Sequence, residues 1–159
     1  MTAVIGQLAP YLASGFRLDG SIEQGDVQWL NQTVNTSIAQ GATCLFASGY
    51  VSQNTTTFAA TFAGIAMIQQ TITTPTSAIP IITPNRNKYF VAPCINGPVT
   101  QAAVGTNCDL GSSGQAVNLT ANSPTAFAFQ ITDIDISTMA LAANANGYVR
   151  GRFCTATAA

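Results

Sequence analysis

The chain has 159 residues, of which only 7% are charged, and its formal net charge is -1. Five basic residues cannot form a stripe that follows a phosphate backbone, so the composition argues against nucleic acid as a partner. No apolar run approaches the roughly 20 residues of a membrane span. The first residues also lack the basic region of a signal peptide, so we expect no membrane partner and synthesis in a cytoplasm.

The scarcity of charge also bears on the surface of the protein. Typical soluble domains contain about 25% charged residues, and a net charge near zero favours association between molecules. We therefore expect a working surface that is largely covered by partners or by further copies of the same chain. The alternative is a secreted sandwich rich in Thr and Asn, whose neutral surface still forms hydrogen bonds.

Residues 1–19 precede any strong strand pattern and are predicted to form an extended N-terminal arm. Tyr11, Phe16 and Arg17 are its candidate contacts with a neighbouring subunit, because aromatic and arginine side chains often dominate interface energy. The alternative is that Tyr11 and Phe16 pack against strands of their own chain.

Residues 20–72 are predicted to form an N-terminal β-module. Short runs rich in β-branched and aromatic residues alternate there with Gly, Asn and Ser. The runs are DVQWLNQTV, ATCLFASGYV and GIAMIQQTIT. In residues 52–64, Phe58 and Phe62 have helical spacing, but three consecutive threonines favour an extended segment that places both rings in the core.

Residues 73–85 carry Pro75, Pro80 and Pro84, and this density of proline predicts a connector or an edge segment rather than a central strand. Residues 86–159 then form a C-terminal β-module, with the strand-like runs KYFVAP, GQAVNLT, TAFAFQIT and GYVRGRF. The two modules are expected either to have separate cores or to share one. The pattern predicts an all-β protein, an antiparallel sandwich or a small barrel, without βαβ alternation or a repeat of fixed period.

Two local features are predicted in the C-terminal module. Ser137 is a good N-cap and Gly147 a good C-terminal cap, so a short helix is expected near 137–146. Phe129 and Ile131 alternate along one face of a strand, but Ile134 and Ile136 have the opposite phase. A bulge or bend near residues 132–133 would account for the change.

The acidic pair Asp133 and Asp135 has the same spacing as Arg150 and Arg152. The strands that carry them are natural antiparallel neighbours, so we predict a cross-strand charge ladder that fixes their register. Asp135 could instead cap the short helix, and a metal site or catalysis are the remaining alternatives.

Other residue types offer little chemistry. The chain contains no histidine, which excludes Ser-His-Asp and Cys-His catalysis, so no enzymatic activity and no cofactor are expected. Its four cysteines have no CxxC spacing, which argues against zinc. Cys94 and Cys108 could form a disulfide in an oxidising medium. Residues 19–26 carry three carboxylates but do not match a calcium-binding loop, so they are expected to be solvated turn residues.

Two stretches resemble a known family. AFQITDIDISTMALAANANGYVRGRF near the C-terminus and GATCLFASGYV followed by FAGIAMIQQT are similar to segments of the capsid decoration, or cement, proteins of tailed bacteriophages. The likeness covers residues 38–72 and 126–154. It implies a β-rich protein that binds the outside of an icosahedral head, usually as a homotrimer, and clamps neighbouring major capsid subunits against internal DNA pressure. The resemblance therefore implies a virion protein, synthesised in the host cytoplasm, without catalytic residues.

A second function remains open from the residues alone. Trp29 and Tyr50 could stack on sugars, as in a carbohydrate- or host-binding module at the head of a fibre, spike or adhesin. The alternative for Trp29 is an ordinary place in a core.

Overall fold

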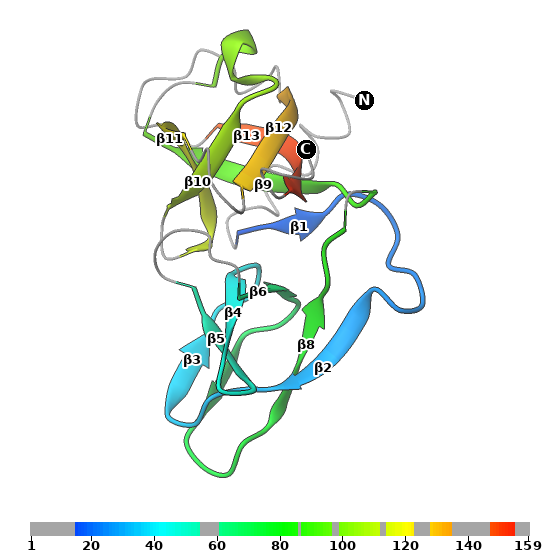
Figure 1. Ribbon diagram of the computed structural model, residues 1–159, viewed down its shortest axis with the longest axis vertical. Helices are drawn as coiled ribbons and strands as arrows, with labels where there is room; N and C mark the ends of the chain where they lie inside the picture. The colour runs from blue at the N-terminus through cyan, green and yellow to red at the C-terminus, as the bar shows by residue number, and fades with distance from the viewer. Residues whose placement is uncertain are drawn as a thin grey trace.

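The computed structural model describes residues 15–54, 61–85, 87–96, 99–111, 114–122, 128–134 and 147–154. Strands dominate this part of the chain, and the prediction of an all-β fold is confirmed. The strands form two bodies, with β2 to β8 below and β9 to β13 above in Figure 1. The predicted helix near 137–146 lies outside the described residues.

The N-terminal body is a five-stranded antiparallel sheet in the order β2-β8-β6-β4-β5. Its strands are β2 (Val27–Asn31), β4 (Thr43–Ala47), β5 (Tyr50–Gln53), β6 (Phe62–Ala66) and β8 (Ala78–Ile82), with a separate ribbon of β3 (Thr36–Ile38) and β7 (Gln70–Ile72). A parallel bridge between Gln32 and Val51 brings the two outer strands together and curls the sheet into a barrel. We call this body the N-terminal barrel.

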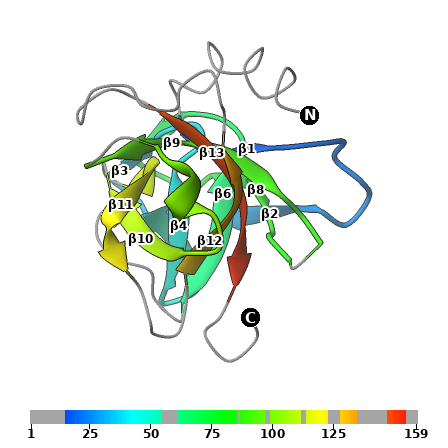
Figure 2. The same ribbon diagram turned by 90° about the horizontal axis from the view of Figure 1, so that it is seen from above.

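The C-terminal body is a closed five-stranded barrel. Its strands are β9 (Phe90–Ile95), β10 (Asn107–Gly111), β11 (Ala116–Asn122), β12 (Ala128–Ile134) and β13 (Tyr148–Cys154), and the 3-10 turn η2 (Gln101–Ala103) follows β9. The order β9-β11-β10-β12-β13 returns to β9, and only the pair β9–β11 is parallel. Figure 2 shows these strands around a common interior. The short strand β1 (Arg17–Leu18) adds to the outside of β9.

The period of two along β13 shows how sequence places residues in this C-terminal barrel. Val149, Gly151 and Phe153 are buried, whereas Arg150 and Arg152 between them are partly exposed. Phe153 lies within a cluster of aromatic rings, with centroids 4.9–5.3 Å apart, that also includes Phe16, Phe62, Phe90 and Phe129. The cluster closes the end of the barrel that faces the N-terminal barrel.

The two barrels meet through apolar side chains. Ile65 of β6 and Ile82 of β8 are buried in the same cluster as the aromatic residues of the C-terminal barrel. The interior of the N-terminal barrel forms a second cluster, which includes Ile38, Cys44, Val51, Ile79 and Ile81. Each barrel therefore has its own interior, and the modules share an apolar contact between them.

The prediction that residues 73–85 form a connector or edge segment is wrong for β8. This strand lies between β2 and β6, although it contains Pro80. Pro80 stands opposite Trp29 at a position where the ladder with β2 needs no amide hydrogen, since the neighbouring pairs carry the hydrogen bonds. On its other side β6 has ended, and the Met67 amide donates to the Pro80 carbonyl at 3.0 Å. The N-terminal barrel therefore extends to Ile82, beyond the predicted boundary at residue 72.

The expected change of phase in β12 is confirmed. The register with β13 shifts between Ile131 and Asp133, which are the residues on either side of the predicted bulge. As a result Ile131 and Ile134 are both buried although they are three residues apart.

The two barrels have the same topology, although the sequence shows no repeat of fixed period. The order β2-β8-β6-β4-β5 corresponds to β9-β13-β12-β10-β11, and in both barrels the first and third strands in sequence are joined in parallel. Residues at matching places include Gly41 and Gly105, whose amides donate to the carbonyls of Ala66 and Ile131 at 2.8 and 2.7 Å. We infer that the chain is a tandem pair of one β-barrel unit.

Candidate interaction surface

Tyr11, Phe16 and Arg17 were predicted to contact a neighbouring subunit, and the structure describes two of them. Phe16 is only 3% exposed and packs edge-on against Phe129 in the C-terminal barrel, so its assignment to an interface is wrong. Arg17 begins β1 and lies opposite Val91. Tyr11 lies outside the described residues. The described end of the predicted arm is therefore part of the chain's own fold.

The predicted charge ladder is correct in its backbone register but not in its ion pairs. Asp133 lies directly opposite Arg150, but Arg150 makes its ion pair with Asp19 and covers the ring of Tyr89 at 4.0 Å. The Asp133 carboxylate accepts instead from the Ile134 amide at 2.8 Å.

At the next position the Arg152 Nε donates to the Gln130 side chain at 3.0 Å. Asp135 lies outside the described residues. These groups attach β1 and join β12 to β13, which is a structural role.

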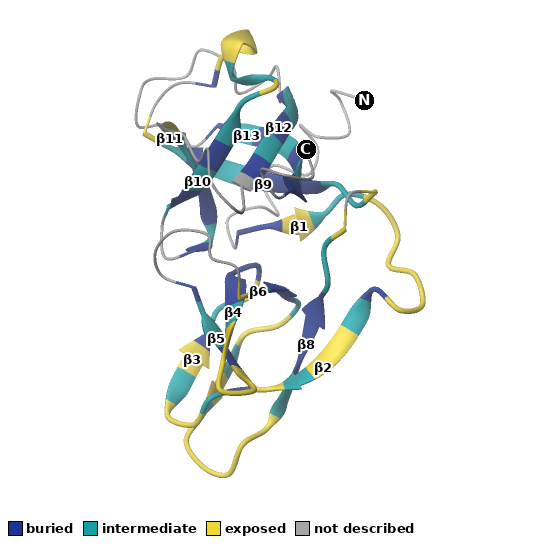
Figure 3. Cartoon of the chain, in the orientation of Figure 1, coloured by how far each residue is buried: buried dark blue, intermediate teal, exposed yellow. Residues whose placement is uncertain are grey.

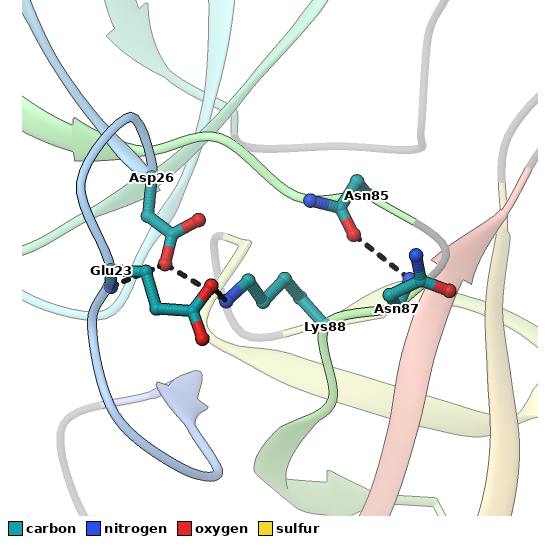
Figure 4. Close-up of polar contacts among 5 residues, drawn as sticks. All are labelled: Glu23, Asp26, Asn85, Asn87 and Lys88. Atoms are coloured by element: carbon teal, nitrogen blue, oxygen red, sulfur yellow. Dashed lines mark hydrogen bonds and ion pairs between the residues drawn. The ribbon is translucent and has the colours of Figure 1, made fainter.

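The carboxylates of the loop between β1 and β2 are held by a cation of the chain itself. The Lys88 ammonium lies 2.9 Å from the Asp26 carboxylate and 3.3 Å from that of Glu23, as Figure 4 shows. The Glu23 amide, which donates to Asp26, and the Lys88 hydrogen bond lower the pKa of Asp26. The hydrogen bond with Asp26 in turn raises the pKa of Lys88. This cluster ties the loop to the entrance of β9, where the Asn87 amide donates to the Asn85 side chain.

The cysteines are buried in the two barrels. Cys94 and Cys108 are free thiols, so the disulfide considered from the sequence is not formed. Burial raises the pKa of Cys44 to about 12 and also raises the pKa values of Cys94 and Cys108. Thiols in this state are poor nucleophiles and poor metal ligands. Within the described ranges, no group of three or more His, Cys, Asp or Glu side chains is arranged to hold a metal ion.

In the described part of the chain, exposed large apolar side chains are confined to the N-terminal barrel and the loop that precedes it. Six large apolar residues are exposed in the described part of the chain: Ile22, Trp29, Val34, Phe46, Tyr50 and Ile68. All six come from the N-terminal half, and Trp29 is the most exposed at 68%. It lies on β2, which is largely exposed along the right side of Figure 3. The alternative prediction that Trp29 lies in a core is therefore wrong.

The strands of the N-terminal barrel carry no ionised side chain. Residues 27–85, which include every strand of the N-terminal barrel, contain no Asp, Glu, Lys or Arg. Sequence reasoning noted the low overall charge but not its distribution, although the charge-free run is directly visible in the sequence. A surface without ionised groups, with exposed aromatic side chains, resembles the centre of a protein–protein interface.

A groove lies where the two barrels meet. Its volume is about 230 Å³, and its walls come from β1, the loop before β4, and the ends of β6 and β8. Phe16, Ile65 and Ile82 contribute apolar walls, while Arg17 and Gln40 contribute polar ones. The groove at the junction of the barrels is therefore lined by both apolar and polar groups.

Comparison with known proteins gives no significant match to a family model, to a curated protein or to a solved structure. Among the described residues, the structure contains no helix with the length and hydropathy of a membrane span. The functional argument therefore rests on the surface itself.

Proposed function

We propose that this protein is a non-enzymatic structural component of a phage head, which binds the outside of the capsid and stabilises contacts between major capsid subunits. The observation that carries the proposal is the charge-free N-terminal barrel, which exposes five large apolar side chains, Trp29, Val34, Phe46, Tyr50 and Ile68. The resemblance of residues 38–72 and 126–154 to capsid decoration proteins supports the same function.

The physical reason is the low cost of covering such a surface. Burying an ionised group without a partner costs several kcal/mol, and residues 27–85 contain no Asp, Glu, Lys or Arg to bury. Each Å² of apolar area removed from water contributes about 25 cal/mol. The hydroxyl and amide groups of the Thr, Asn and Gln side chains can exchange water for hydrogen bonds to a partner.

In this proposal the N-terminal barrel faces the capsid and the C-terminal barrel faces solvent. The C-terminal barrel has the opposite character, since its outer face carries the Arg150–Asp19 ion pair and the Arg152–Gln130 hydrogen bond. A homotrimer would place three such barrels around a point where capsid subunits meet, so that each copy bridges neighbours.

The test is binding of the purified protein to phage heads that lack it. We expect saturable co-sedimentation at a fixed ratio to the shell protein, and a higher temperature of DNA release from the decorated heads. Tyr50→Lys, which places a charge on the apolar surface, should weaken binding at least tenfold.

The matched control is Arg152→Ser, which removes a charged guanidinium from the C-terminal barrel and should leave the affinity unchanged. Equal loss in both variants would contradict the orientation. A wild-type protein that does not bind heads at all would refute the proposed function.

A carbohydrate- or host-binding function is the second candidate, because Trp29 is 68% exposed and Tyr50 is 40% exposed. Aromatic rings at this exposure can stack on sugars. Quenching of the single tryptophan by glycans of the host surface, together with failure to bind heads, would favour this second function.

A further inference from the structure

The equivalence of the two barrels extends to individual residue pairs all the way round each barrel. In each matching set below, the first pair belongs to the N-terminal barrel and the second to the C-terminal barrel. The sets are Cys44–Gly64 and Cys108–Phe129, Ile65–Ile82 and Gln130–Arg152, Gln28–Ile81 and Phe90–Gly151, and Gln32–Val51 and Cys94–Val117. This common register assigns Val27 to Tyr89 and Trp29 to Val91.

The outer edge of β9 is covered by β1. The Asp19 amide donates to the Tyr89 carbonyl at 2.8 Å, and Arg17 pairs antiparallel with Val91. The third position on this edge is Pro93, which has no amide hydrogen to satisfy. Where the outer edge of β9 has backbone amide hydrogens, β1 therefore pairs with it.

The corresponding edge of β2 has no such cover. The Thr83 backbone amide donates to the Asp26 backbone carbonyl at 2.8 Å, and the Gln32 backbone amide donates to the Ser77 carbonyl at 2.9 Å. The even-numbered residues of the β2 segment therefore hydrogen-bond toward β8. The backbone groups of Val27 and Trp29 therefore point to the opposite side. The Thr33 amide reaches Val51 on that side, but no described residue pairs with Val27 or Trp29 there.

This edge also lacks the features that normally prevent strands of different molecules from pairing. Monomeric proteins protect exposed edges with charged residues, prolines or bulges. Residues 27–31 have none of these, and Trp29 adds an exposed apolar ring beside the free backbone groups. With a net charge of -1, little electrostatic repulsion opposes the approach of a second molecule.

We propose that β2 of one molecule pairs antiparallel with β2 of a second copy of this chain, across a two-fold axis at Gln28. Val27 of each copy then lies opposite Trp29 of the other, and each of these two pairs exchanges two backbone hydrogen bonds. The second copy takes the place on β2 that β1 takes on β9. An antiparallel edge without charge is self-complementary in this arrangement, which is what a two-fold interface requires.

The pairing does not depend on the proposed function. If that function holds, the two-fold contact would add to a homotrimer rather than replace it, because neighbouring three-fold positions on an icosahedral shell are related by two-fold axes. The dimer would then join adjacent trimers.

The test is the solution mass of the full chain as a function of concentration, measured without phage heads. The mass should rise from 16.4 kDa toward twice that value. Trp29→Lys, which adds an edge charge, and Val27→Pro, which removes an outward amide hydrogen, should both remain monomeric. Thr76→Lys, which adds the same charge to an exposed loop of the same barrel, should dimerise like the wild type.

Hydrogen exchange gives a second readout. The amides of Val27 and Trp29 should exchange more slowly at high concentration, while those of Tyr50 should not change. Circular dichroism shows whether each variant is folded. If Val27→Pro has lost its fold, the mass of Trp29→Lys and the hydrogen-exchange data test the pairing.

A wild-type protein that stays monomeric at every concentration would refute the proposal, as would self-association that persists in both edge variants. If the Trp29 amide became protected only when the protein bound heads, the occupant would be a capsid strand and the two-fold pairing would be wrong. Since the mass measurement uses no heads, its outcome is separate from that of the head-binding experiment.

Discussion

Phe16 provides the sharpest test of how the start of the described chain is held. Its side chain is 3% exposed and its ring centroid lies 5.3 Å from that of Phe129 and 5.2 Å from that of Phe153. Replacing a buried Phe with Ala costs about 3–5 kcal/mol. Phe16 also lines the groove between the barrels, so water can fill part of the vacated space. We therefore expect Phe16→Ala to lower the free energy of unfolding by about 3 kcal/mol, at the low end of the range.

The assay is thermal unfolding followed by near-ultraviolet circular dichroism. For a chain of this length, about 3 kcal/mol corresponds to a decrease in Tm of about 6–12 °C. Phe16→Leu keeps most of the apolar volume and should cause a smaller decrease. A Phe16→Ala protein with the wild-type Tm but weaker head binding would refute this reasoning, because it would make Phe16 the interface residue that the sequence suggested.

Three further predictions concern single groups. Because the pKa of Asp26 is lowered, the ionised Asp26 carboxylate stabilises the fold above pH 3.8, and this stabilisation is lost as the pH falls through the lowered pKa. Lys88→Met should make the free energy of unfolding, measured by urea titration, depend less on acid pH. Because burial raises the pKa of Cys44 to about 12, the native thiol should resist alkylation at pH 8 and react fully in denaturant. Gly151→Ala should destabilise the protein by about 1–3 kcal/mol in the same titrations, since its new methyl would lie about 2.6 Å from the Phe129 ring and press on the Gln130 carbonyl.

Local patterns in the sequence predicted much of the fold. Alternation of apolar residues identified the strands, and the change of phase between Ile131 and Ile134 located the bulge in β12. The antiparallel register of Asp133 and Arg150 was also predicted from spacing. These features depend on neighbours along the chain or on one adjacent strand, which is why pattern alone reveals them.

Features that depend on which distant parts of the chain lie beside a residue were not predictable. Pro80 was assigned to a connector because proline breaks a ladder, but its ring faces a position where β6 has already ended. Arg150 was assigned to Asp133, and the nearer partner Asp19 comes from a segment 131 residues away in sequence. Both outcomes depend on the tertiary arrangement.

The tandem repeat escaped detection because the barrels preserve burial rather than identity. The cross-strand pair Ala66–Ile81 in one barrel corresponds to Ile131–Gly151 in the other, so the large and small residues have exchanged places. All four are buried in the interiors of their barrels. Such exchanges conserve volume and erase sequence similarity.

The claim that the charge-free N-terminal barrel is the covered face has one direct measurement, oxidative footprinting of Tyr50 in the free protein and on decorated heads. Tyr50 is 40% exposed in the single chain and lies outside the β2 edge that pairs two copies, so its ring should react in the free protein at any concentration. We predict strong protection of Tyr50 on heads, with unchanged reactivity of Tyr148 on the C-terminal barrel. Equal reactivity of Tyr50 in both states, or protection of Tyr148 alone, would contradict the account.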